Sequence, residues 1–184
     1  TDYPHCLSKF GNKDLFGFGN FIINIMNSET ELKQSLFFFD SGRDVVEHHA
    51  LNDNVPLEYV NSYDYIKPSQ IRWYENELKA LRSTYGEVKN SLYMHIPVQE
   101  YKQAFKLDEN GDYLRDENGE LLRAEDKQLL RNENAKILYG RMFETVGCSK
   151  HNSGLFESMK KNDAVGIFSG HDHVNDIAFR LEGI

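Results

Sequence analysis

The sequence lacks several features that would place it in a well-defined class. Only two cysteines occur in 184 residues, Cys6 and Cys148, too few for a disulfide scaffold; the two could pair or remain thiols. No apolar run approaches the ~18 residues of a membrane span, and the run Leu36–Phe39 is among the longest. The chain has fewer basic residues (21 Lys and Arg) than acidic residues (29 Asp and Glu), which gives it a net charge of −8. A phosphate backbone attracts basic surfaces, so we expect neither a nucleic-acid nor a membrane partner.

Several catalytic signatures are also missing. The chain contains no Gly-x-Ser-x-Gly elbow, no phosphate-binding loop of the Gly-x-x-x-x-Gly-Lys-Ser/Thr type and no Cys-x-x-Cys pair. Its 40% hydrophobic and 27% charged residues are typical of a globular domain. The sequence starts at Thr1 without Met and stops at Ile184 without a cap or polar tail. These ends predict a piece of a longer chain, so the localisation stays unknown.

Strands and helices are predicted to alternate. Apolar, β-branched and aromatic residues predict strands over residues 15–26, 36–39, 91–96, 164–168 and 177–181. A helix is expected over residues 68–85, with Pro68 and Ser69 as its start signal, and a shorter one begins near Gly154. The run 36–39 is expected to be buried on both faces, and residues 43–66 to be irregular. This alternation indicates a layered α/β fold, whose functional groups lie on loops beyond strand ends.

An internal repeat covers residues 108–123. Asp-Glu-Asn-Gly-Asp-Tyr-Leu-Arg is followed by Asp-Glu-Asn-Gly-Glu-Leu-Leu-Arg, and each Asn-Gly pair favours a hairpin turn. We expect a small β-meander there, projecting into solvent, and then a helix over residues 124–139. The acidic residues do not form an EF-hand loop, because the template requires Gly and Glu where Tyr113 and Gly119 stand.

The motif Gly170-His171-Asp172-His173 carries the strongest chemical signal. In an extended backbone, residues i and i+2 share a face, so His171 and His173 could bind one metal ion or two neighbouring ions. Asp172 and Asp176 could then orient the ligands. A polar turn with two exposed histidines is the alternative. His95, at the end of the strand predicted over 91–96, joins the site only if it meets His171 in space.

Five motifs in order resemble one known family. They are Phe38-Phe39-Asp40-Ser41-Gly42, Gln70-Ile71-Arg72-Trp73, Met94-His95-Ile96-Pro97, Asn152-Ser153-Gly154-Leu155-Phe156 and the run from Phe168 to Asp176. Together they resemble the calcineurin-like metallophosphoesterases, in the branch related to purple acid phosphatases. The resemblance implies an α/β/β/α sandwich, of which residues 1–184 would form the C-terminal part, with a β-hairpin insertion near 106–123.

The resemblance also implies a metal centre. His95 and His171 would hold one ion and His173 the other, with Asp172, Asn175 and Asp176 supporting them. The two ions would be iron, zinc or manganese, and a metal-bound hydroxide would attack phosphorus in line. The family's Asp-x-His, Gly-Asp and Gly-Asn-His blocks are absent, and neither Asp40 nor Asp64 fits them. The bridging aspartate and the general-acid histidine would therefore lie upstream.

Three functions remain open at this point. The first is a metal-dependent phosphoesterase acting on a phosphorylated small molecule or a phosphoprotein, with this chain alone inactive. The second is a non-catalytic binding module that keeps the fold and part of the metal site. The third is a metal-storage domain that would depend on His95, His171 and His173. An incomplete sheet would expose edges and apolar faces, so a homo-oligomer is also an expectation.

Overall fold

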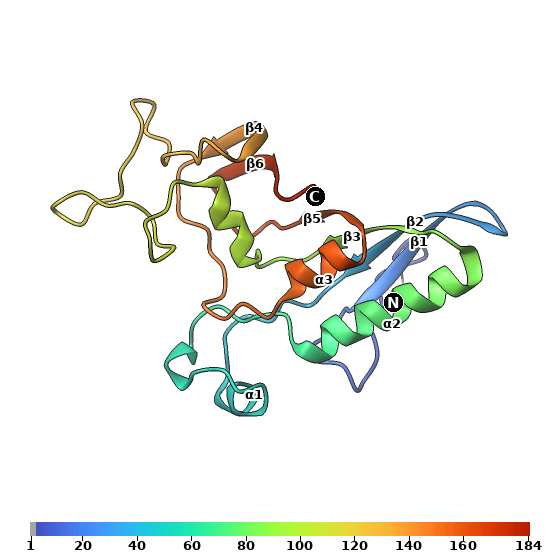
Figure 1. Ribbon diagram of the computed structural model, residues 1–184. Coiled ribbons are helices and arrows are strands. Elements are labelled where there is room, and N and C mark those ends of the chain that lie inside the picture. Colours follow the sequence, from blue (N-terminus) through green and yellow to red (C-terminus); the bar gives the residue numbers. More distant parts are fainter. Residues whose placement is uncertain (1–2) are drawn as a thin grey trace.

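Two sheets make up the regular β structure of residues 3–184, which the computed structural model describes (Figure 1). The larger sheet has the order β1-β2-β3-β5, where β1 is antiparallel to β2 and the other pairs are parallel. The smaller sheet pairs β4 with β6 in antiparallel fashion. The bounds are β1 Phe21–Ser28, β2 Glu31–Phe38, β3 Lys89–Tyr93, β4 Lys136–Met142, β5 Ala164–Phe168 and β6 Asn175–Arg180. With the helices between them, these strands confirm the predicted α/β class.

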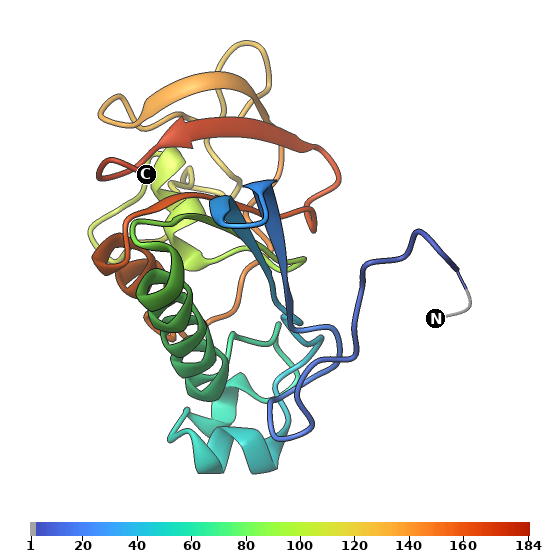
Figure 2. The same ribbon diagram turned by 90° about the vertical axis from the view of Figure 1, so that its right-hand side faces the viewer.

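Two helices cover one face of the larger sheet (Figure 2). They are α2, Pro68–Tyr85, and α3, Leu155–Lys161, both close to their predicted positions. At the start of α2, Gln70 Oε1 accepts a hydrogen bond of 2.8 Å from the backbone N–H of Lys67, which satisfies one donor that the first turn leaves free. The main core lies between helices and sheet and includes Phe37, Tyr74 and Leu92. Among the described helices, none has the length and apolarity needed to cross a membrane.

The opposite face of this sheet carries a ladder of four aromatic rings. Phe21, Phe38, Tyr93 and Phe168 stand in register on the four strands, with ring centroids 4.7, 5.0 and 4.9 Å apart. The rings are half-buried, except that Phe168, on the edge strand, is 53% exposed. Burial of residues 36–39 on both faces is therefore wrong for this side of β2, because Phe38 belongs to the ladder.

Several other segments also differ from the prediction. β1 begins at Phe21 and not at residue 15, because Gly17 and Gly19 adopt φ of 79° and 89°, outside the strand region. Residues 43–66 contain the short helices α1, Glu47–Asn52, and η1, Leu57–Tyr59, packed around a small cluster. β3 ends at Tyr93, so His95 lies on the loop beyond the strand.

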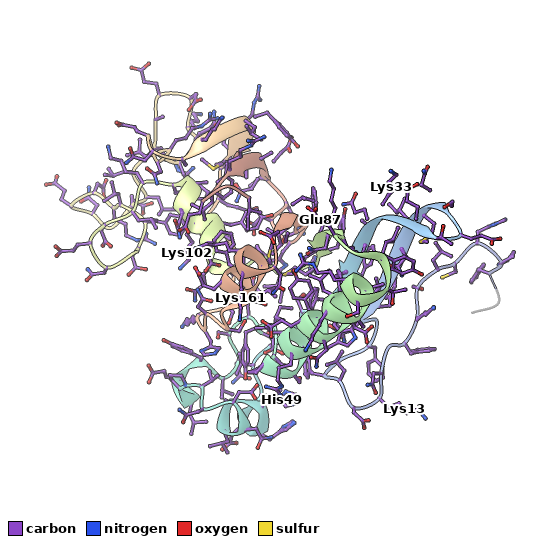
Figure 3. All side chains as sticks on the ribbon, turned by 45° about the vertical axis from the view of Figure 1, so that its right-hand side comes forward. Lys13, Lys33, His49, Glu87, Lys102 and Lys161 are labelled. Atoms are coloured by element: carbon purple, nitrogen blue, oxygen red, sulfur yellow. The ribbon has the colours of Figure 1, made fainter. Side chains whose placement is uncertain are left out.

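The helix predicted over residues 124–139 is wrong. This segment continues the eight-residue repeat, giving units 108–115, 116–123, 124–131 and 132–139, and the last unit runs into β4. Turns in the first three units are closed by isolated bridges, such as Arg123↔Leu129 in the third. We call residues 106–135 the repeat arm. It projects from the larger sheet on the side away from the β1–β2 turn (Figure 1). Lys33 near that turn and Lys102 on η2, Gln99–Ala104, at the base of the arm mark the two sides in Figure 3.

The repeat arm has its own apolar cluster. The sixth residue of every unit packs into it together with Phe105, Met142 and residues of β6; these sixth residues are Tyr113, Leu121, Leu129 and Ile137. In units 108–115 and 116–123 the first residue, an aspartate, builds the turn: Asp108 Oδ1 accepts the backbone N–H groups of Asn110 and Asp112 at 2.8 and 2.9 Å, and Asp116 makes the equivalent two bonds. These backbone hydrogen bonds, chiefly that from Asp112, lower the pKa of Asp108. Its carboxylate therefore serves the turn, as the rejection of an EF-hand requires.

Candidate metal centre

Adjacent parallel strands bring two predicted ligands together. β3 and β5 are neighbours in the sheet, with Tyr93 opposite Phe168. The pairing continues beyond the strands, because the Met94 N–H donates to the Phe168 carbonyl at 3.0 Å. The loops that follow therefore leave the sheet side by side. His171 Nδ1 and His95 Nε2 are hydrogen-bonded to each other at 3.0 Å, with the two rings at 87° to each other.

This pair of nitrogens suits one metal ion. Two ligands bound at ~2.0–2.1 Å with an angle of about 90–110° between them lie roughly 2.8–3.4 Å apart, and the observed 3.0 Å falls within this range. Neutral imidazole is a good ligand for zinc, iron and related ions. His95 is exposed and His171 is half-buried, so the site is open to solvent on one side. The two rings are thus close enough to hold one ion between them in place of their hydrogen bond.

His173 does not join this pair. The backbone bends at His173 and Val174, which breaks the extended geometry on which a shared face depends. His173 lines a shallow hollow with Arg141 and Phe143 instead. Within residues 3–184, no group of three or more His, Cys, Asp or Glu side chains is arranged to hold a metal. A second ion on His173 stays a prediction.

Within the described residues, none of the three predicted supporting residues bonds to an imidazole ring, and Asp172 and Asn175 bond to backbone groups and to each other. Asp172 Oδ1 accepts the Gly147 N–H at 2.9 Å, and Asp172 Oδ2 accepts the Asn175 amide at 3.0 Å. Asn175 Oδ1 in turn accepts the backbone N–H of Phe143 at 2.9 Å. Asp176 is exposed and lies in β6, where its backbone stands opposite that of Arg141 in β4. Asp172 and Asn175 therefore fix the loop that carries His171.

Sequence reasoning missed four neighbours of the site. The Tyr63 ring stands edge-on against His171 at 4.6 Å, and the Ser41 hydroxyl accepts the Ile96 N–H at 3.0 Å beside His95. Glu144 and Gly147 come from the segment 143–147. This segment lies against residues 169–174, the loop between β5 and β6, which we call the histidine loop. Ser41, within a quoted motif just after β2, had a local signal. The other three are brought in by contacts distant in sequence.

The two carboxylates considered as substitutes for the missing ligands have structural roles. Asp40 accepts the backbone N–H groups of Phe18 and Gly42 at 2.7 and 2.9 Å. Asp64 forms a buried ion pair with Lys67. Burial lowers the pKa of Lys67, and the ion pair opposes that shift. Neither carboxylate is grouped with the histidines as a metal ligand.

A cavity adjoins the histidine pair. It measures about 520 Å³ and lies between β5 and β6, with Tyr101, Phe156, Phe179, His171 and Asp172 in its wall. This volume is within the range of small-molecule sites. Glu100 also lines the cavity: its Oε1 accepts the Asn152 amide at 2.7 Å, while its buried Oε2 has no partner among the described residues.

Comparison with known proteins gives three relatives from Arabidopsis thaliana. The chain is 26% identical over 187 residues to "Probable inactive purple acid phosphatase 29", covering 91% of the chain and 37% of the relative. It is 27% identical over 198 residues to "Probable inactive purple acid phosphatase 14", covering 98% and 41%. It is 24% identical over 176 residues to "Probable inactive purple acid phosphatase 28", covering 91% and 34%. The chain thus spans about two fifths or less of the length of these curated relatives. No protein-family profile and no solved structure matches it.

Proposed function

Because the chain is related to the purple-acid-phosphatase-like metallophosphoesterases, we propose that it forms part of a metal-dependent phosphoesterase. One observation carries the proposal: the 3.0 Å approach of His171 Nδ1 to His95 Nε2 at the ends of two parallel strands. His95 and His171 would hold one ion through these nitrogens. Asp172 and Asn175 keep the loop of His171 in place through the contacts described above.

The bound metal would supply positive charge that the protein itself lacks. In a chain of net charge −8, a phosphate ester meets a repulsive surface, and metal ions offset that repulsion and polarise the phosphoryl group. We further propose that the centre is dinuclear, of iron, zinc or manganese, with His173 on the second ion. Within residues 3–184, no carboxylate lies together with the two histidines in a group that could hold a metal ion, so a bridging carboxylate is absent there. Our proposal is that this chain is the C-terminal part of the domain and that ligands outside it complete the site.

The cavity beside His171 supports a substrate with an apolar portion. The wall of this cavity includes the aromatic side chains of Tyr101, Phe156 and Phe179. We propose that the group attached to phosphorus occupies this space. A phosphorylated small molecule or a phosphorylated side chain of a protein has this character.

A non-catalytic module is the second candidate. The relatives are named as probable inactive phosphatases, and the alternative agrees with those names. In that case the chain would keep the fold and the His95–His171 pair, and would bind a metal or a phosphate without hydrolysing an ester.

The test has two stages. First, zinc or manganese binding is measured for the 184-residue chain and for His171→Ala, with His48→Ala as the matched control on the exposed helix α1. We expect His171→Ala to abolish binding and His48→Ala to leave it unchanged; equal binding in both would refute the proposed metal pair. Second, hydrolysis of p-nitrophenyl phosphate is measured for a longer protein that contains this chain, loaded with metal. Hydrolysis that His171→Ala reduces at least 100-fold supports the enzyme, whereas bound metal without hydrolysis of any phosphoester supports the non-catalytic module.

A further inference from the structure

Two side chains of the repeat arm bond to the backbone of the segment 143–147: Tyr113, the sixth residue of its unit, and Arg123, the eighth residue of its unit. The eighth residue of a unit is arginine in the first three units, and each of these donates to a backbone carbonyl of the next turn or strand. Arg115 donates to the Gly119 carbonyl at 2.8 Å, which keeps the bond within the arm. Arg123 makes the equivalent bond to Lys127 at 2.9 Å and a second one, also 2.9 Å, to the carbonyl of Phe143.

Tyr113 makes the other connection. Its hydroxyl accepts the backbone N–H of Val146 at 2.8 Å, and its ring packs edge-on against Phe105 in the apolar cluster of the arm. Burial raises the pKa of this hydroxyl. Tyr113 and Arg123 therefore hold both ends of the segment 143–147, from units 108–115 and 116–123.

The segment 143–147, which bonds to the repeat arm, also forms hydrogen bonds with the histidine loop. Glu144 Oε1 accepts the backbone N–H groups of His173 and Val174 at 2.8 and 3.0 Å. The Asn175 side chain bonds to the backbone of Phe143 and Glu144. Gly147 donates to Asp172 and lies so close to the His171 ring that a Cβ there would be 2.6 Å from Cδ2.

We propose that the repeat arm positions the histidine loop, with Tyr113 and Arg123 as positioning residues that act through the segment 143–147. The loop itself has an exposed bend at His173 and Val174, and hydrogen bonds to this segment fix its path. The arm thereby orients His171 toward His95. The link to metal binding rests on the proposed function, whereas the effect on the loop does not.

Amide hydrogen exchange of the metal-free 184-residue chain, read by NMR, tests the effect on the loop. The reporters are the N–H groups of Gly147, His173 and Val174. The variants are Tyr113→Phe and Arg123→Ala. Loss of one hydrogen bond changes a local opening equilibrium by about fivefold, and we expect exchange to accelerate by about that factor in each variant. Arg123→Lys, which can still reach a carbonyl, should restore part of the protection.

Two matched controls separate positioning from general stability. Arg115→Ala removes the equivalent arginine whose bond stays within the arm, and Tyr139→Phe removes the hydroxyl of an exposed tyrosine at the end of unit 132–139. Both should leave exchange at the three reporters unchanged. Equal exchange in Tyr113→Phe and Tyr139→Phe, and in Arg123→Ala and Arg115→Ala, would overturn the inference.

A zinc titration of the same proteins, followed by the ring resonances of His95 and His171, separates the inference from the proposed function. A decrease in affinity of about fivefold in Arg123→Ala but not in Arg115→Ala is the expected result. Absence of zinc binding in every protein, with the exchange differences present, would refute the metal site and leave the positioning role intact. Zinc binding that is equal in all variants, with equal exchange, would refute the positioning role alone.

Discussion

Gly147 offers a direct way to displace His171 relative to His95 without replacing either histidine. A methyl group at this position would lie 2.6 Å from His171 Cδ2 and 3.1 Å from its Nε2. Carbon atoms are in favourable contact at about 3.5–4.0 Å, so the imidazole must move by about 1 Å. Such a shift changes the 3.0 Å separation of the two ring nitrogens by up to about 1 Å, which takes the pair out of the geometry that one ion accepts. Disturbing the support of a metal-binding histidine lowers affinity by about 10–100-fold, and we expect that decrease for Gly147→Ala.

Gly170→Ala is the control for this experiment. Gly170 precedes His171, yet no heavy atom lies within 4 Å of the place where its Cβ would be. Neither glycine has a positive φ, so alanine is compatible with both backbones. Calorimetric zinc titration of both variants, with melting temperatures as a check on folding, gives the comparison. Equal affinities would show that His171 does not need its observed position to bind metal, and the reasoning from the 3.0 Å pair would fail.

Three further predictions concern stability. Lys67→Met leaves the buried carboxylate of Asp64 without its cation, which should lower the free energy of unfolding by about 3–5 kcal/mol. Lys33→Met, at the exposed pair with Glu31, should lower it by under ~1 kcal/mol, and urea unfolding measures both. Leu129→Ala removes a side chain that is 2% exposed in the arm cluster and should cost about 2–5 kcal/mol, but Leu122→Ala, at 38% exposure, should change little; equal losses in urea unfolding would contradict the arm cluster. Burial lowers the pKa of His151 below its usual 6.5, so the unfolded chain binds its proton more readily and stability should fall as pH decreases through 6.5. His151→Gln should flatten that part of the stability profile in urea unfolding, and an unchanged slope would contradict this role.

The elements that were predicted best are those whose neighbours in sequence decide their structure. α2 has a proline start, apolar residues at helical spacing and a glycine after its last turn, and it matches its predicted range. β5 is a short apolar run between turn signals and also matches. The predicted helix over 124–139 failed for a local reason. Units 108–115 and 116–123 carry glycine in the left-handed turn position, but Lys127 takes that conformation in the third unit with a φ of 65°. Because lysine is not a typical turn residue, the sequence gives no signal for the turn at Lys127. The Leu-Leu-Arg sequence at residues 129–131 is also compatible with a helix.

The site was predicted in part for an equally physical reason. His95 and His171 follow the ends of two apolar runs, and parallel neighbours align such ends, so their meeting follows from topology. The separation of His173 depends on a bend held by Glu144, 29 residues away in the chain. Contacts of that kind leave no periodic signal. Gly147 is similar, since its need for a hydrogen in place of a side chain arises only from the His171 ring.

The acidic side chains around the His95–His171 pair are already engaged in other bonds, so the two imidazoles are the ligand groups that remain there. Asp40, Asp172 and Glu144 each accept backbone N–H groups, and Asp64 is paired with Lys67. A carboxylate used in this way is held by donors that a metal would have to replace, and each lost bond leaves a backbone group unsatisfied. These carboxylates therefore hold the loops that follow β2 and β5 in shape. A two-ion centre at this edge must take its bridging carboxylate from residues not engaged in loop formation, which agrees with the proposal that further ligands complete the site.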